Sequence, residues 1–490
     1  MFESANLGQT VAKEAYEREV PALRASLLDA QYDLFEAKRF PVLVIIAGVE
    51  AAGKAETVQR LNEWMDPRHI VNHGFLTPSS EEAERPPMFR FWRALPPKGR
   101  IGIFFGSWYT MPILDRAFRK TSVAEFERSI DEIRHLERML ANEGVLIVKF
   151  WFHLSKERER KRLKALERDP ATRWKVPKRS WEFFRHYDRL MKVNERILRE
   201  TSTAEAPWTV IDAWDEHYRE LTVGRVLLDA MRARLAGQAA PTVTAPPINP
   251  RVENVKLVRS LDLSQRIDKA EYDRRLAKHQ GRFAQLLRGK KFDGRSLILV
   301  FEGADAAGKG SAIRRVAGAL DARYYRIVPI AAPTDEERAQ PYLWRFWRHV
   351  PGHRGVVIFD RSWYGRVLVE RVEGFCSESD WMRAYDEING FETELARNGA
   401  ILCKFWLQIS KAEQLRRFRE RERTRFKRFK ITEEDWRNRK KWGAYEQAVA
   451  DMVDRTSTDH APWTLVEADD KRFARVKVLK TIVDRLEASL

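Results

Sequence analysis

The side chains best suited to chemistry lie at the ends of two short apolar runs in the second half of this 490-residue chain. The run Leu297–Phe301 leads into a glycine-rich loop, GADAAGKG at residues 303–310, and the run GVVIFD ends in Asp360, which Arg361 follows. Glycines let backbone N–H groups turn toward an anion, and a helix that starts behind such a loop adds its positive end. The spacing therefore predicts a P-loop that cradles phosphate.

Within this loop we expect Lys309 to supply a mobile cation. The other phosphate-loop residues are Gly303, Ala306, Ala307, Gly308, Gly310 and Ser311. Gly310 stands where a Ser or Thr hydroxyl normally binds magnesium, and Ser311 comes one residue too late. The metal must then rely on carboxylates, so we predict Mg²⁺ as the cofactor, with Asp360 and Asp305 as its ligands.

Basic residues gather behind Asp360 and in a stretch further along the chain. Arg361, Arg366 and Arg371 could clamp phosphoryl oxygens, although each could also be a solvated surface charge. The stretch LRRFRERERTRFKRFK, residues 415–430, is too densely basic for one solvated helix face. We expect it to form a lid that closes over phosphates. The plainer structural readings remain a solvated helix for this stretch, an Asx turn for Asp305 and a strand-end cap for Asp360.

These motifs recur in the first half of the chain at one fixed offset. Lys54 matches Lys309 at 309 − 54 = 255, and the same offset links the RFWR, SWY, KFW and APW segments of the two halves. Chance matches would not share one register, so we predict a duplicated domain. Strands alternate with helices in each copy, which predicts an α/β fold with a parallel sheet flanked by helices and a basic helical lid.

The boundary between the copies is predicted in a proline-rich linker at 236–255, which leaves domains 1–235 and 256–490. The net charge of +18 favours a polyanionic partner. The two cysteines, Cys376 and Cys403, exclude a disulfide framework and fit a reducing compartment. Neither an apolar span nor a secretory signal is recognisable, so we expect a cytoplasmic protein without membrane association.

The motifs FEGADAAGKG, FDRSWYGR, VERVEGFC, KFWLQISKAEQLRRF and TSTDHAPWTLVEADDK together resemble the polyphosphate kinase 2 family, and within it the fused two-domain branch. The likeness covers nearly the whole second copy and, more weakly, the first. It implies transfer of a terminal phosphoryl group from inorganic polyphosphate to AMP, giving ADP. Under this resemblance Asp305, Lys309, Asp360 and Arg361 are the catalytic residues.

The resemblance also implies further contacts in the second copy. Polyphosphate would be held by the basic residues Arg366, Arg371, Arg421, Lys427 and Arg428. Asp335 and Arg345 are candidates for nucleotide binding. Nucleic acid is not the expected partner, and the oligomeric state is open, a homo-oligomer included.

The first copy departs from the pattern at the reacting positions. Glu50 replaces Asp305, Ala55 replaces Gly310, and Phe105-Gly106 stands where the second copy has Asp360-Arg361, although Lys54 and Arg90 remain. Magnesium needs oxygen ligands, which Phe105 cannot provide. We therefore expect this copy to be catalytically inactive and to serve packing, assembly or the holding of polyphosphate.

Two other functions fit parts of the sequence. An ATP-dependent nucleotide or small-molecule kinase would share the P-loop but would not need so basic a lid. A non-catalytic P-loop protein that binds nucleic acid would use the basic surface and show a steep salt dependence. Formation of ADP from AMP and polyphosphate without ATP would separate the three.

Overall fold

The structure, a computed structural model, describes residues 2–6, 8–75, 77–237, 256–425 and 431–490. The chain divides into two compact units. The first comprises Met1–Pro78, Arg90–Val243 and Pro333–Arg345, and the second comprises Ser79–Phe89, Thr244–Ala332 and Phe346–Leu490. Most of the predicted linker at 236–255 lies outside the described residues.

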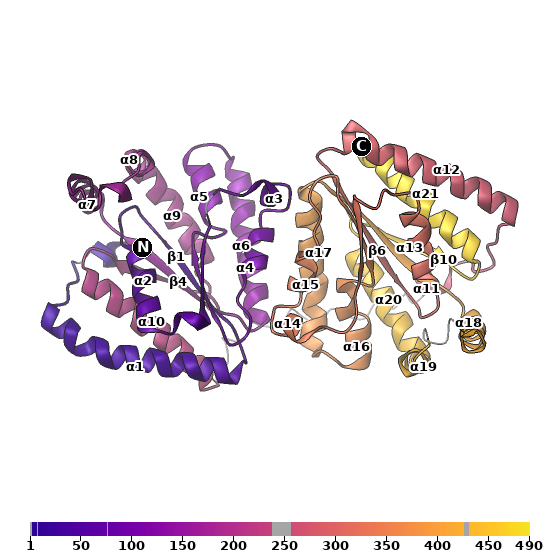
Figure 1. Cartoon of the computed structure of the whole chain (residues 1–490), viewed down its shortest axis with the longest axis horizontal. Helices are drawn as coiled ribbons and strands as arrows, with labels where there is room; N and C mark the ends of the chain where they lie inside the picture. The colour runs from indigo at the N-terminus through magenta and orange to yellow at the C-terminus, as the bar shows by residue number, and fades with distance from the viewer. Residues whose placement is uncertain (1, 7, 76, 238–255, 426–430) are drawn as a thin grey trace. The chain divides into compact units, whose positions relative to one another are not determined.

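Each unit is built on a five-stranded parallel sheet (Figure 1). The first sheet has the order β2-β3-β1-β4-β5, with strands β1 (Val42–Gly48), β2 (Ile70–Gly74), β3 (Ile101–Phe105), β4 (Leu146–His153) and β5 (Trp208–Asp212). The second has the order β7-β8-β6-β9-β10, with strands β6 (Ser296–Gly303), β7 (Tyr325–Pro329), β8 (Val356–Asp360), β9 (Ala400–Gln408) and β10 (Trp463–Glu467). The orders are the same, which confirms the predicted duplicated α/β fold.

Helices alternate with the strands in both copies. Along the first copy they are α1 (Lys13–Ala37), α2 (Lys54–Trp64), α3 (Ser80–Ala83), α4 (Phe89–Ala94), α5 (Thr110–Ala117), α6 (Val123–Asn142), α7 (Lys156–Arg168), α8 (Lys178–Arg185), α9 (Tyr187–Thr201) and α10 (Glu216–Leu235). Along the second they are α11 (Lys256–Arg259), α12 (Lys269–Arg288), α13 (Lys309–Ala317), α14 (Asp335–Arg338), α15 (Trp344–Trp347), α16 (Val369–Glu373), α17 (Glu378–Arg397), α18 (Lys411–Arg423), α19 (Glu433–Lys440), α20 (Trp442–Thr456) and α21 (Lys471–Ser489).

Short 3₁₀ helices supplement these elements. They are η1 (Glu3–Asn6), η2 (Pro67–His69), η3 (Arg173–Lys175), η4 (Lys290–Phe292) and η5 (Trp363–Arg366). No helix in the described part of the chain combines the length and the apolar character that a membrane span requires. The cytoplasmic location stays a prediction.

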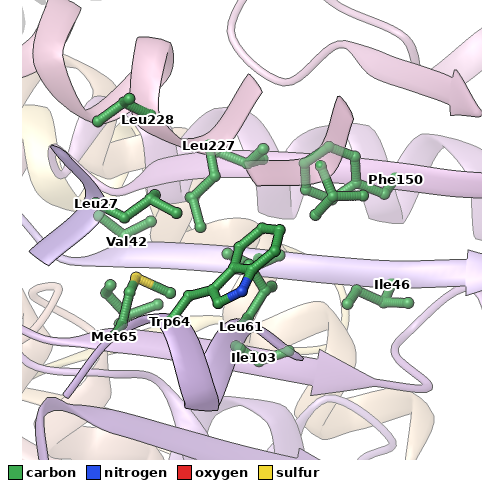
Figure 2. Close-up of a cluster of buried hydrophobic side chains, with 14 of the residues drawn as sticks. Leu27, Val42, Ile46, Leu61, Trp64, Met65, Ile103, Phe150, Leu227 and Leu228 are labelled. Carbon is green, nitrogen blue, oxygen red and sulfur yellow. The ribbon is translucent and has the colours of Figure 1, made fainter. Parts of the chain in front are cut away.

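The central strands are buried on both faces of their sheets. Val42, Leu43, Val44 and Ile45 of β1 are fully buried, as expected for a parallel strand that helices cover from both sides. In the first unit one face packs on α1, α2 and α10, where Trp64 lies among Leu27, Leu61 and Leu227 (Figure 2). This packing fixes the carboxyl ends of the strands, and the loops that leave them carry the candidate site.

Candidate active site

The glycine-rich loop of the second copy leaves β6 and enters α13, as the sequence predicts. Gly303 has a φ of 155°, and a Cβ there would lie 2.6 Å from the Leu407 carbonyl oxygen, so no side chain fits. Ala306 and Gly308 have φ values of 63° and 111°. This left-handed backbone turns the loop tightly onto the start of α13, the geometry that directs N–H groups at an anion.

Lys309, the first residue of α13, reaches back across the loop. Its Nζ donates to the carbonyl oxygens of Gly303 at 2.6 Å and Ala304 at 3.4 Å. Burial, and next the neighbouring charge of Arg361, lower the pKa of this ammonium. The sequence predicts a mobile cation, whereas the structure holds Lys309 Nζ on two carbonyl oxygens. A cation held in this way loses little freedom when a phosphate arrives.

Asp360 ends β8 directly beside the loop. A Cβ on Gly310 would lie 4.0 Å from Asp360 Oδ2, so this carboxylate faces the position where other P-loops carry a magnesium-binding hydroxyl. The structure therefore brings Asp360 to the place that the sequence argument requires.

Asp305 and Arg361 meet across the mouth of the sheet. Arg361 Nη2 donates to Asp305 Oδ1 at 3.3 Å, and Asn438 of α19 donates to Asp305 Oδ2 at 2.8 Å. Arg361 has a φ of 66°, a backbone region that costs a non-glycine residue roughly 1–2 kcal/mol. Strain of this kind persists where the side chain has a use at that place. Asn438 is a site residue that the sequence analysis missed, because a lone Asn in a charged helix gives no signal.

A cavity of about 600 Å³, lined by seven basic and five acidic residues, opens above the loop; we call it the phosphate cavity. The phosphate-loop residues Ala306, Ala307, Gly308, Gly310 and Ser311 line its floor. Its cationic residues include Lys309, Arg314, Arg361, Arg421, Lys471 and Arg475. Of the predicted lid residues, Arg421 lies in this wall, whereas Lys427 and Arg428 fall outside the described residues.

Arg417, in the middle of the basic stretch, is buried rather than available for substrate. Its Nη1 donates to the carbonyl oxygens of Ala306 and Ala307 at 2.9 and 3.0 Å, and its Nη2 donates to those of Ala468 and Asp469 at 2.7 and 2.8 Å. This guanidinium thus braces the phosphate loop from below. Charge density in the sequence could not distinguish it from its solvated neighbours.

The structure does not bring four of the predicted binding residues to the phosphate cavity. Arg366 pairs with Glu370 at 3.3 Å, and Arg371 pairs with Asp451 at 2.7 Å and lies over the Trp381 ring. Asp335 is almost fully exposed and pairs with Arg338, and the buried Arg345 pairs with Glu337 at 3.2 Å.

A second, smaller cavity adjoins the phosphate cavity; we call it the aromatic pocket. Trp406, Trp442 and Tyr445 form its aromatic wall. Three residues line both cavities, namely Asp305, Arg361 and Asn438. A flat, largely apolar group in this pocket would therefore end at the carboxylate and the guanidinium beside the phosphate loop.

The SWY motif behind Arg361 has a structural role. Trp363 Nε1 and Tyr364 Oη donate to Glu392 Oε1 at 3.0 and 2.7 Å, and Lys404 Nζ donates to Glu392 Oε2 at 2.7 Å. Both charges of the pair are fully buried. A buried ion pair is tolerated when hydrogen bonds satisfy its remaining atoms, as here, and this network fixes the segment that follows Asp360.

A strand, a glycine loop and a helix that set a lysine beside a strand-end aspartate define a P-loop phosphotransferase. A model of the polyphosphate kinase 2 family matches residues 10–239 and again 266–490. The chain belongs to the polyphosphate kinase 2 family and contains its domain twice.

Relatives with the same two-domain length agree with this assignment. The chain is 58% identical to a Pseudomonas aeruginosa protein named polyphosphate:AMP phosphotransferase, over 100% of this chain and 99% of that protein. A protein of the same name from Acinetobacter johnsonii is 37% identical, over 98% of both chains. A crystal structure of a polyphosphate kinase 2 from Pseudomonas aeruginosa superposes with a TM-score of 0.90 at 55% identity, over 100% of this chain and 99% of that one.

Proposed function

We propose that the second copy transfers the terminal phosphoryl group of inorganic polyphosphate to AMP and so forms ADP. The observation that carries this proposal is the junction of the two cavities at Asp305, Arg361 and Asn438. A donor chain of phosphates in the phosphate cavity and a nucleotide in the aromatic pocket would meet there. Full-length relatives named polyphosphate:AMP phosphotransferase support AMP as the acceptor.

The transfer requires no covalent enzyme intermediate. One phosphoanhydride bond replaces another, so the chain's own residues need only align the groups and neutralise charge. Lys309 and Arg361 would stabilise the oxygens of the phosphoryl group in transit, and Arg421 would hold the polymer behind it. Because the exchange is nearly isoenergetic, its net direction follows the substrate ratio.

We also propose Mg²⁺ as the cofactor, with Asp360 as the principal ligand. The carboxylate of Asp360 faces Gly310, where no hydroxyl competes for the ion, whereas both oxygens of Asp305 already accept hydrogen bonds. Among the described residues no group of three or more His, Cys, Asp or Glu could hold a metal. Magnesium usually binds one or two carboxylates together with phosphates and water. When bound, the ion would neutralise charge on the transferring phosphates.

The adenine of AMP is proposed to lie against Trp442 and Tyr445. An indole and a phenol ring offer flat apolar surface for stacking, worth about 1–3 kcal/mol per base. Trp442→Ala should therefore raise the KM for AMP by roughly tenfold and leave the KM for polyphosphate nearly unchanged. Steady-state kinetics with each substrate varied in turn would measure this. Equal changes in the KM for AMP and the KM for polyphosphate would contradict the placement of adenine in this pocket.

The function itself is tested by incubating the purified chain with magnesium, AMP and long-chain polyphosphate. We expect ADP to form without added ATP, and the Lys309→Ala variant to serve as the control for contaminating kinases. A phosphoryl acceptor that is used only when ATP is present would instead indicate an ATP-dependent kinase.

A further inference from the structure

The first copy contains a cavity at the same place in the fold as the aromatic pocket; we call it the first-copy pocket. All but one of the residues that line the aromatic pocket have their counterpart, 255 positions earlier, in the wall of the first-copy pocket. The exception is Gln408, whose counterpart is His153. A cavity that is repeated residue for residue is a feature of the domain and not an accident of packing.

The first-copy pocket is wider than its counterpart and lacks three of the charged residues that line the aromatic pocket. Its volume is about 380 Å³ against about 90 Å³, within the range of small-molecule sites. Three charged residues are replaced by smaller or uncharged ones: Glu302 by Ala47, Arg361 by Gly106, and Glu446 by Met191. Phe105 and Phe183 add aromatic surface to the wall. The pocket has thus lost the groups for phosphoryl transfer and gained surface that suits a flat apolar ligand.

Buried polar atoms of three uncharged or protonated side chains on this wall have no hydrogen-bond partner within the part of the chain that the structure describes. They are Trp151 Nε1, Glu159 Oε2 and Asn194 Oδ1, on residues that are only 3%, 2% and 5% exposed. In the second copy Trp406 Nε1 donates to Gln408 Oε1 at 2.7 Å, and Val449 stands in place of Asn194. An unsatisfied buried polar group costs about 1–3 kcal/mol, so a polar ligand that reached these atoms would remove that cost.

The polar edge of the pocket, formed by Trp151, Glu159 and Asn194, is mainly neutral. Burial raises the pKa of Glu159 to about 8, so its carboxyl group is mostly protonated at neutral pH and can donate. Lys54 Nζ is held by the Gly48 and Val49 carbonyl oxygens, and Ser180 Oγ donates to Glu50. Arg90 and Arg179 complete the charged part of the wall.

We propose that the first-copy pocket binds a purine nucleoside, free or as its monophosphate, without phosphorylating it. The base would stack on the aromatic wall and present its polar edge to Trp151, Glu159 and Asn194. The evidence that a ligand binds here is the volume of the first-copy pocket and the buried polar atoms on its wall. The choice of a nucleoside rests also on the function proposed for the second copy, because the two pockets share one position.

Isothermal titration of the full-length chain with AMP, and separately with adenosine, tests the proposal. We expect two AMP sites per chain. Leu190→Trp should fill the first-copy pocket and leave one site, with ADP formation retained. Val71→Trp, at an exposed position of β2 outside the pocket, is the matched control and should keep both sites.

Asn194→Val, which installs the residue of the second copy, provides a readout that a purely structural role would not give. It should weaken nucleoside binding at the first site at least about tenfold while the thermal midpoint stays equal or rises, because a buried unsatisfied acceptor is removed. Unchanged binding in this variant would overturn the proposal. The proposal would also be overturned if the wild type bound only one AMP and the Leu190→Trp variant still bound it.

The ADP assay separates this proposal from the proposed function. Suppose that Leu190→Trp removes one nucleoside site, and that neither the wild type nor this variant makes ADP from polyphosphate. The ligand site in the first copy then stands, and the proposed function fails. If ADP forms but only the second copy binds nucleotide, the function stands and the first-copy site is rejected. A crystal soaked in adenosine that shows only water between Phe105 and Trp151 would also reject it.

Discussion

The two copies keep the same buried framework and differ where substrates would touch them. Lys149 donates to Glu137 at 2.6 Å and to the Thr201 carbonyl oxygen at 2.8 Å, and Lys404 repeats both contacts at 2.7 Å with Glu392 and Thr456. Removing one partner of such a pair would strand a buried charge at a cost of about 3–5 kcal/mol. Arg361, by contrast, is 42% exposed in its pair with Asp305, so its loss strands no fully buried charge and the fold can remain.

The strand ends show this difference most clearly. Gly106 and Arg361 occupy equivalent positions, both with left-handed φ values of 77° and 66°. Glycine adopts this conformation freely, whereas arginine is strained. The second copy thus holds a less stable residue at the point where its two cavities meet, and the first copy has the relaxed one. At this position, glycine favours local stability, whereas arginine provides the charge for phosphoryl transfer.

The strongest test of the comparison is the pair of loop lysines. Lys309→Ala should lower turnover by roughly 10²–10³, the usual loss for one preorganised charge at a transition state. Lys54→Ala removes the equivalent contacts in the first copy and should leave turnover almost unchanged. Measuring kcat for both variants decides the matter, and a similar loss in Lys54→Ala would show that both copies catalyse.

Asp360→Asn should reduce turnover on the order of 10² at low magnesium, because it keeps the shape of the side chain and removes the charge assigned to the metal. Asp305→Asn should have the smaller effect, since both Asp305 oxygens are engaged by Arg361 and Asn438. Rates measured across a magnesium titration test this ranking. A magnesium dependence identical to that of the wild type would exclude Asp360 as a ligand.

The basic lid should affect the polymer more than the nucleotide. Neutralising Arg421, Lys427 and Arg428 together should raise the KM for polyphosphate several-fold. Polyphosphate binding should also depend less steeply on salt concentration, because fewer counterions are released. Equal effects on the KM for AMP would point instead to a general defect in closure. Arg366→Gln is the comparison variant, since its ion pair with Glu370 lies away from the phosphate cavity.

The smallest effect on turnover is expected from Glu159→Gln, which gives the first copy the residue that the second has at Gln414. The folded-state pKa of Glu159 is raised to about 8 from an ordinary value of 4.5, so its neutral form favours the folded state. That contribution is complete below pH 4.5 and is lost as the pH rises toward 8. Thermal unfolding across this range should show a smaller decline for the variant than for the wild type, and parallel curves would contradict the buried, protonated carboxyl.

The sequence alone determined the duplication, the parallel α/β fold and the positions of the loop and of Asp360. These follow from local chemistry: apolar runs long enough for buried strands, glycines where the backbone must turn, and a carboxylate at a strand end. The fixed offset between the copies then showed which of these features the first copy lacks.

Only the tertiary structure decided what individual charged residues do. Arg417 and Arg421 lie four positions apart in one basic helix, yet Arg417 braces the loop carbonyls and Arg421 faces the phosphate cavity. Arg371 looked like a phosphate ligand and is committed to Asp451. The aromatic pocket, Asn438 and the polar edge at Glu159 gave no sequence signal either. The type of a side chain limits which groups it can bind. Its actual partner depends on elements that come from distant parts of the chain.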